Sequence, residues 1–313
     1  MADTTKKIGD LDVFPLSLGG NVFGWTADRD GSFAVLDAYT AGGGDFVDTA
    51  DVYSAWVPGN RGGESEEILG AWLASRRNRA DVVIATKGGS HPDHQGLAGP
   101  TLTAALDGSL RRLGTDYIDL YYTHRDDPSV PVEEIITTLD GFVRAGKVRQ
   151  IAASNISAER LEAALAFSER EGLARYAAIQ PHYNLVSRDT YEGPLQDAAE
   201  RHGLAALPYS ALASGFLSGK YRPGADVASA RAGKAAAYLE TGRGRAVLAA
   251  LDAVAETRNI AVPTVALAWL NARPTVTAPV ASARTVEHLP PLLASARVEL
   301  TPDEVAALTA ASA

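Results

Sequence analysis

Short apolar runs alternate with stretches of helical periodicity along most of the chain. A run of about four to eight apolar residues is typical of a buried strand, whereas apolar positions recurring every three or four residues are typical of an amphipathic helix. The runs that we predict as strands are residues 13–19, 45–49, 81–87, 117–124, 147–154, 176–181, 204–210 and 275–281. Most are apolar at consecutive positions, as expected of parallel strands that are covered on both faces.

The segments between these strands carry the end signals of helices. These signals are Gly114 after a leucine stripe at 102–113, Pro131 and Gly146 around a stripe at 135–143, Ser157 as an N-cap, and Thr301, Pro302 and Glu304 at the start of a final helix. The pattern is therefore an alternation of strands and helices that continues to the end of the chain.

Eight strand–helix units in 313 residues predict an α/β fold, a (β/α)8 TIM barrel in which residues 1–313 form one domain. A doubly wound parallel sheet is the alternative, but it requires a glycine-rich phosphate loop after an early strand. The glycine pairs at 215–221 and 241–246 have neither that spacing nor that position. The segment 222–246, rich in small residues, is predicted to be a surface excursion after the seventh strand, either disordered or a mobile lid.

Charge and composition exclude several classes of partner. The formal net charge of −9 argues against nucleic acid, which usually requires a basic face. The longest strongly apolar region, 260–270, is too short to span a bilayer, and the N-terminus has no signal-peptide pattern, so we expect a cytoplasmic protein without a membrane partner. The chain has no cysteine, and His91 and His94 resemble a metal-binding pair only in isolation, so no metal site is predicted.

Four polar side chains follow three successive predicted strands. Asp48 ends the second strand and Tyr53 lies in its loop, while Lys87 ends the third strand and His124 ends the fourth. The C-terminal strand ends form the active face of such a barrel, and neighbouring strands lie about 5 Å apart. We therefore expect these four side chains to meet in one small volume.

These residue types suit proton transfer to a carbonyl group. An ammonium group beside a phenol lowers the pKa of the phenol, which is ordinarily about 10, and a carboxylate keeps the ammonium charged. We therefore expect Lys87 to lower the pKa of Tyr53. The phenol could then protonate a carbonyl oxygen while a hydride reaches the carbon, with His124 hydrogen-bonded to the same oxygen.

Each residue also has an ordinary structural explanation. Asp48 with Lys87 could be a buried structural ion pair, His124 a satisfied barrel histidine, and Tyr53 a packed aromatic residue. Their joint placement at adjacent strand ends favours a functional site over all of these alternatives together.

Several motifs resemble those of one known superfamily. In order, they are FVDTADVYS (46–54), GGESEEILGAWL (62–73), VVIATK (82–87), LRRLGTDYIDLYYTHRDD (110–127), AGKVRQIAASN (145–155), AIQPHYNL (178–185), YSALASGFLSGKY (209–221) and SARTVEHL (282–289). Through them the chain, from about residue 8 to its end, resembles the aldo/keto reductase superfamily. The resemblance implies a barrel with an N-terminal hairpin and an extra C-terminal helix. It also implies a catalytic tetrad of Asp48, Tyr53, Lys87 and His124, with Tyr53 as the general acid.

The resemblance further implies that NADPH, or NADH as the alternative, lies across the barrel top. We expect the segment 222–246 to be a mobile loop over the cofactor. The implied cofactor-binding residues are Ser154, Asn155, Gln180, Tyr209, Ser210, Leu212, Gly215, Leu217, Lys220, Ser282, Arg284 and His288. Arg284 favours NADPH, because arginine suits bidentate phosphate contacts. Pro290, Pro291 and Leu292 replace the residues that usually contact the adenine, which could relax that preference.

The expected activity is NADPH-dependent reduction of small aldehydes or ketones, with Trp25 and Trp56 as walls of the substrate pocket. Two other functions compete with it. A nicotinamide-binding sensor would bind the cofactor with little turnover, and an aldolase-like barrel would use Lys87 to form a Schiff base.

Overall fold

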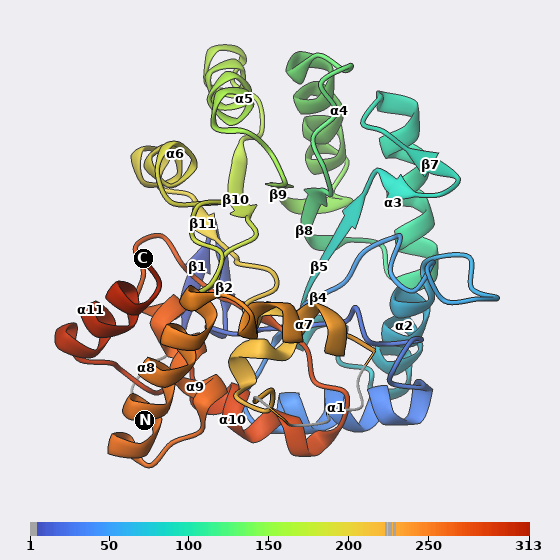
Figure 1. Ribbon diagram of the computed structural model, residues 1–313. Helices are drawn as coiled ribbons and strands as arrows, with labels where there is room; N and C mark the ends of the chain where they lie inside the picture. Colours follow the sequence, from blue (N-terminus) through green and yellow to red (C-terminus); the bar gives the residue numbers. More distant parts are fainter. Residues whose placement is uncertain (1–4, 223, 225–226, 228–229) are drawn as a thin grey trace.

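A barrel of eight parallel strands forms the centre of the molecule, and Figure 1 shows the helices arranged around it. The computed structural model describes residues 5–222, 224, 227 and 230–313. In spatial order the strands are β11 (Ala205–Ala206), β10 (Tyr176–Gln180), β9 (Val148–Ser154), β8 (Ile118–Thr123), β5 (Val83–Gly88), β4 (Phe46–Asp48), β3 (Ser17–Gly19) and β12 (Val280–Ala281). Each neighbouring pair is parallel, which confirms the predicted fold class.

The last two strands are shorter than the predicted runs 204–210 and 275–281. Pro208 and Pro279 lie within those runs, and proline has no backbone N–H to donate to a neighbouring strand. Backbone hydrogen bonds nevertheless close the barrel: Ala206 N donates to Thr275 O at 2.8 Å, and Thr277 N donates to Ala206 O at 2.9 Å.

Helices lie between and after the strands, and those with predicted end signals begin or end within two residues of the signals. They are α1 (Arg29–Ala41), α2 (Glu64–Arg76), α3 (Gly99–Leu113), α4 (Val132–Arg144), α5 (Ala158–Glu171), α6 (Pro194–His202), α7 (Ala232–Leu239), α8 (Gly242–Arg258), α9 (Val262–Asn271), α10 (Leu289–Ala294) and α11 (Pro302–Ala311), with 3₁₀ turns η1 (Arg79–Asp81), η2 (Ala213–Ser218) and η3 (Val286–His288). Ser157 caps α5, and Thr301 with Glu304 forms the capping box of α11. No helix within the described residues is long and apolar enough to cross a bilayer.

The core has two layers, one on each side of the strands. Outside the barrel, buried residues of the strands pack against those of the helices. Inside it, Phe46, Tyr122 and Leu207 pack with Ile8 and Leu11 of an antiparallel hairpin formed by β1 (Lys6–Ile8) and β2 (Leu11–Val13). The hairpin confirms the N-terminal element that the resemblance implied, and its apolar side chains complete the inner core.

The segment 222–246 contains more regular structure than the predicted excursion. Residues 232–239 form α7, which packs against η2 and α8, and α8 begins at Gly242. Most of the small residues in 232–239 are alanine, which has the highest helix propensity, and this explains why the stretch is helical. Residues 223, 225–226 and 228–229 of the predicted excursion lie outside the described residues.

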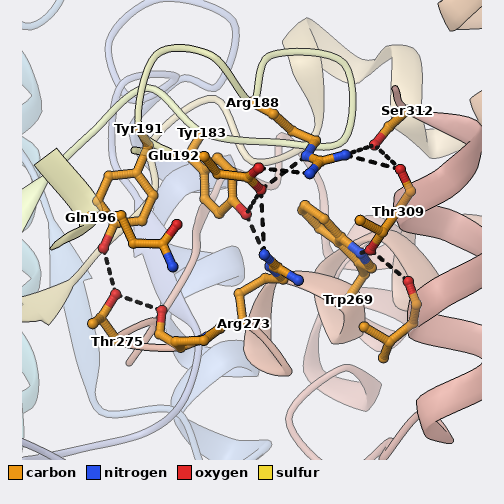
Figure 2. A network of polar contacts seen from close by, with 12 residues as sticks. Tyr183, Arg188, Tyr191, Glu192, Gln196, Trp269, Arg273, Thr275, Thr309 and Ser312 are labelled. Carbon is orange, nitrogen blue, oxygen red and sulfur yellow. Dashed lines mark hydrogen bonds and ion pairs between the residues drawn. The ribbon is translucent and has the colours of Figure 1, made fainter. Parts of the chain in front are cut away.

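Polar contacts attach the final helix to the barrel (Figure 2). Arg188, in the loop after β10, donates to Thr309 O and to Ser312 Oγ, both at 2.9 Å. The same guanidinium pairs with Glu192 at 2.6 Å, and Trp269 of α9 donates to Thr309 Oγ1 at 3.0 Å. The chain end is thereby bound to Trp269 and to Arg188, which lies more than a hundred positions earlier in the chain.

Candidate active site

Three of the four predicted catalytic side chains point into the barrel because of strand periodicity. Side chains alternate between the two faces of a strand, and Phe46, Ala85 and Tyr122 pack in the inner core. The residues two positions further along each chain segment are Asp48, Lys87 and His124. All three therefore lie at the C-terminal mouth of the barrel.

Lys87 is the centre of the polar cluster. Its Nζ donates to Asp48 Oδ2 at 2.6 Å, to Thr49 O at 2.7 Å and to the Tyr53 hydroxyl at 3.0 Å. The Lys87 and Asp48 side chains are each 1% exposed. Gln180 Nε2 donates to the other oxygen of Asp48 at 2.8 Å. All three ammonium protons are thus directed at oxygen atoms, and both Asp48 oxygens are engaged.

Burial and nearby charges act in opposite directions on the protonation of this cluster. Burial lowers the pKa of Lys87, but Asp48 and Tyr53 together raise it above its ordinary value, so the ammonium stays charged. Burial raises the pKa of Tyr53 above its ordinary value, although the Lys87 cation acts to lower it. The expectation of a net lower phenol pKa is therefore wrong for the protein alone, because the desolvation of the phenolate outweighs the attraction of the ammonium.

His124 is held beside Tyr53 as a neutral imidazole. The two rings lie 6.1 Å apart between centroids, at an interplanar angle of 75°. Burial lowers the pKa of His124 well below its ordinary value, and the charges of Lys87 and Arg125 add to the effect. Asn155 Nδ2 donates to the His124 carbonyl oxygen at 2.9 Å, which fixes the backbone at this position. A neutral imidazole retains one N–H that can donate to an oxygen.

The predicted nicotinamide residues form a connected set next to the tetrad. Ser154 Oγ donates to Gln180 O at 2.9 Å, and Tyr209 OH donates to Asn155 Oδ1 at 2.8 Å. One face of the Tyr209 ring stacks on His182, with ring centroids 5.3 Å apart. The ring also borders a cleft that begins at Tyr53.

This cleft, with a volume of about 300 Å³, runs over the ends of β3, β11 and β12. The predicted residues that line it are Trp25, Tyr53, Tyr209, Ser210, Leu212, Gly215, Lys220, Ser282, Arg284 and His288. Leu217 is fully buried in the core, and Ser154 does not border the cleft. Asn155 and Gln180 instead border a smaller hollow on the other side of Tyr209. The structure thus collects most of the predicted cofactor residues, but not all, along one wall.

Sequence reasoning missed other residues of this cleft, among them Asn21, Thr26, Ser218, Arg231 and Pro263. Asn21 accepts a short hydrogen bond from Ser282 Oγ across the β3–β12 junction. Gly19 is required at the same junction, since a Cβ there would lie 2.7 Å from Ser282 Oγ. The only sequence signal for Gly19 and Asn21 was the GGN stretch at the end of the first predicted strand.

The cleft carries positive charge in an acidic protein. Neither Lys220 nor Arg284 forms a hydrogen bond or ion pair with another described residue. Burial lowers the pKa of His288, and the nearby cations Arg284 and Lys220 lower it further. Pro291 and Leu292 border the same end with apolar surface. These groups fit a phosphate-bearing ligand that also presents an apolar ring.

A second hollow, of about 550 Å³, opens on the other side of Tyr53 and His124. Trp56 borders it and is 48% exposed. The Trp56 ring packs edge-on against Trp25 at 5.6 Å and against Tyr53 at 6.1 Å. The two tryptophans therefore stand at the junction of the two hollows, next to the phenol. His91 and His94 lie elsewhere on the hairpin of β6 (Ser90–His91) and β7 (His94–Gln95), and no described group of three or more His, Asp or Glu could hold a metal ion.

The model of the aldo/keto reductase family matches residues 15–313, and the chain belongs to that family. It is 32% identical to norsolorinic acid reductase stcV of Emericella nidulans, over 96% of this chain and 78% of that protein. It is 34% identical to the uncharacterized oxidoreductase YrpG of Bacillus subtilis (93% and 89%), and 31% identical to protein tas of Escherichia coli (96% and 94%). The protein is thus an NAD(P)H-dependent oxidoreductase of a family that reduces carbonyl compounds.

Proposed function

We propose that this protein reduces small aldehydes or ketones to alcohols with NADPH, and that Tyr53 delivers the proton. The observation that carries this proposal is the contact of a buried, charged Lys87 with both Asp48 and the Tyr53 hydroxyl, at the junction of two hollows. One hollow would hold the cofactor and the other the carbonyl compound.

The residues present fit a bound nicotinamide cofactor. Tyr209 offers a ring face at the Tyr53 end of the cleft, and two cations that form no ion pair with a described residue, Lys220 and Arg284, lie along the same cleft. Bound reduced nicotinamide supplies a hydride from its C4 atom. Arg284 beside the N-terminus of the η3 turn would hold the additional phosphate of NADPH, which NADH lacks.

Each residue of the tetrad would have a separate role in the proton transfer. Tyr53 keeps its proton at neutral pH because its pKa is raised by burial, so its hydroxyl can donate to the carbonyl oxygen. Lys87 donates to the Tyr53 oxygen and stabilises the phenolate that remains after transfer. Asp48 keeps Lys87 charged, and the neutral His124 orients the carbonyl oxygen. A Schiff base at Lys87 would need a neutral amine, which the raised pKa of Lys87 disfavours.

Replacing Tyr53 by Phe tests the proposal. We expect Tyr53→Phe to lower kcat for aldehyde reduction by about 10²–10⁴-fold, because the general acid is lost while the ring remains. The NADPH dissociation constant should change less than about twofold, since the hydroxyl is expected to contact the substrate and not the cofactor. NADPH oxidation over a panel of aldehydes measures the first quantity, and fluorescence titration measures the second.

Undiminished turnover in Tyr53→Phe would refute the assignment of the acid. Tight NADPH binding by the unaltered protein, without turnover on any carbonyl compound, would favour the nicotinamide-binding sensor instead.

A further inference from the structure

Arg125 is a cation at the border of the second hollow that pairs with none of the described residues. It follows His124 directly in the chain and lines the hollow together with Tyr53, His124 and Trp56. Its side chain is exposed, and it forms no hydrogen bond or ion pair with any described residue. Burial lowers the pKa of His124 and raises that of Tyr209, and the Arg125 charge acts to lower both pKa values, as expected of a guanidinium close to these rings.

The backbone that carries Arg125 is fixed on both sides. His124 N donates to Gly88 O at 3.0 Å, and Asp126 N donates to Asn155 O at 3.4 Å. The carbonyl of His124 also accepts from Asn155 Nδ2 at 2.9 Å. The position of the side chain relative to Tyr53 is therefore limited mainly by its own rotamers.

The carboxylates next to Arg125 are engaged with other groups. Asp126 pairs with Arg160 at 2.9 Å, in a contact that is largely buried. Asp127 accepts from Leu97 N at 3.2 Å and from the Ser129 backbone and hydroxyl. Two anions thus stand beside Arg125 in sequence without pairing with it. A guanidinium left unpaired there can form a bidentate contact with an incoming carboxylate.

The other walls of the hollow indicate the shape of such a ligand. Trp56 presents nearly half of its surface to solvent beside Tyr53, and exposed aromatic rings at a binding site usually stack on flat groups. We propose that Arg125 selects carbonyl substrates that carry a carboxylate, in particular flat aromatic aldehydes with an acidic substituent. This inference rests on the proposed reductase function and names the class of its substrate.

A matched pair of aldehydes tests the inference. We expect the unaltered protein with NADPH to have a higher kcat/KM for 4-formylbenzoate than for 4-methylbenzaldehyde, which has a similar shape and no charge. In Arg125→Gln the ratio of the two kcat/KM values should fall at least about tenfold, as expected for loss of a charge-assisted contact. The fall should come mainly from an increase in KM for the charged aldehyde.

Arg111→Gln is the control for this experiment, because Arg111 lies exposed on α3, away from both hollows, and has no described partner either. A ratio that is the same in the unaltered protein and in Arg125→Gln overturns the inference while leaving the reductase function intact.

A second measurement does not depend on turnover. Benzoate should bind to the protein in calorimetry at least about tenfold more tightly than to Arg125→Gln, and addition of salt should weaken that binding. No binding of benzoate to the unaltered protein, or equal binding to both, also overturns the inference. If neither aldehyde is reduced but benzoate binding depends on Arg125, the reductase function fails and the anion site stands.

Discussion

Asp51 lies in the loop between Asp48 and Tyr53, and its carboxylate is fully buried. Its Oδ2 accepts from Gly89 N at 3.2 Å and from His91 N at 3.4 Å, so it joins the Tyr53 loop to the loop after Lys87. Its Oδ1 accepts no hydrogen bond from the part of the chain that the structure describes. Burial raises the pKa of Asp51 to about 7, and the charge of Glu66 adds to the rise, while Arg112 opposes it. One residue of the active-site loop therefore titrates near neutrality.

This shift predicts a pH dependence of stability. The folded pKa of Asp51 lies above its ordinary value of 3.8, so protonation stabilises the fold fully below about pH 4 and the contribution is lost as pH rises through 7. Asp51→Asn is neutral at every pH and keeps an acceptor oxygen. We expect the unaltered protein to lose on the order of 4 kcal/mol relative to this variant between pH 4 and pH 8. Chemical denaturation of the unaltered protein and of Asp51→Asn at each pH measures this loss of stability. A difference in unfolding free energy between the two proteins that is constant across this pH range contradicts the prediction.

At the scale of elements, the distance between two helices depends on a glycine. A Cβ added to Gly70 of α2 would lie 2.3 Å from Arg112 O and 2.8 Å from Leu113 C, which are backbone atoms of α3. Gly141 of α4 also lies within a helix, but an added Cβ there would meet nothing within 4 Å. Both positions look like helix-weakening glycines in the sequence, and only the packing separates them.

Substitution of these two glycines by alanine should have opposite effects. Gly70→Ala forces α2 away from α3 and should destabilise the fold by about 1–3 kcal/mol or more, as for overpacking. Gly141→Ala should stabilise it by about 0.5–1 kcal/mol, because alanine has the higher helix propensity and no contact is disturbed. The midpoints of denaturant unfolding compare the stabilities of the two variants. Equal and small effects of the two substitutions would mean that α2 and α3 pack less closely than the contacts at Gly70 indicate.

Other elements begin or end at capping signals that can be recognised in the sequence alone. Gly114 adopts φ 62° at the end of α3, Ser157 caps α5, and the capping box of α11 forms as predicted. These signals involve neighbouring residues only, so they do not depend on the rest of the fold. The shortness of β11 and β12 and the helix at 232–239 were missed, because strand pairing and helix docking depend on distant partners.

For the whole molecule, charge is distributed unevenly. The chain has a formal net charge of −9, yet Lys220 and Arg284 face the predicted cofactor cleft without a described anionic partner. A negatively charged protein repels an anionic cofactor at long range, so local cations must attract it within about a Debye length. Affinity for NADPH should accordingly fall with added salt.

Arg284→Ala tests the contribution of one of these cations to cofactor preference. We expect NADPH to bind more tightly than NADH to the unaltered protein, and the ratio of the two dissociation constants to shrink by about tenfold in Arg284→Ala, because a charge-assisted phosphate contact is lost. Arg111→Ala, which removes an exposed charge outside the cleft, should leave the ratio unchanged. Equal affinities for the two cofactors in the unaltered protein would refute the predicted preference.

The sequence alone determined the alternation of strands and helices, and with it the barrel and the strand ends where Asp48, Lys87 and His124 stand. It could do so because side-chain direction along a strand has a period of two and depends on no distant residue. Only the tertiary structure decided that burial outweighs Lys87 at the Tyr53 phenol, that Asp51 is desolvated, and that Asp126 pairs with Arg160 whereas Arg125 pairs with no described residue. Desolvation and ion pairing depend on atoms from many segments of the chain, and these atoms come together only when the chain is folded.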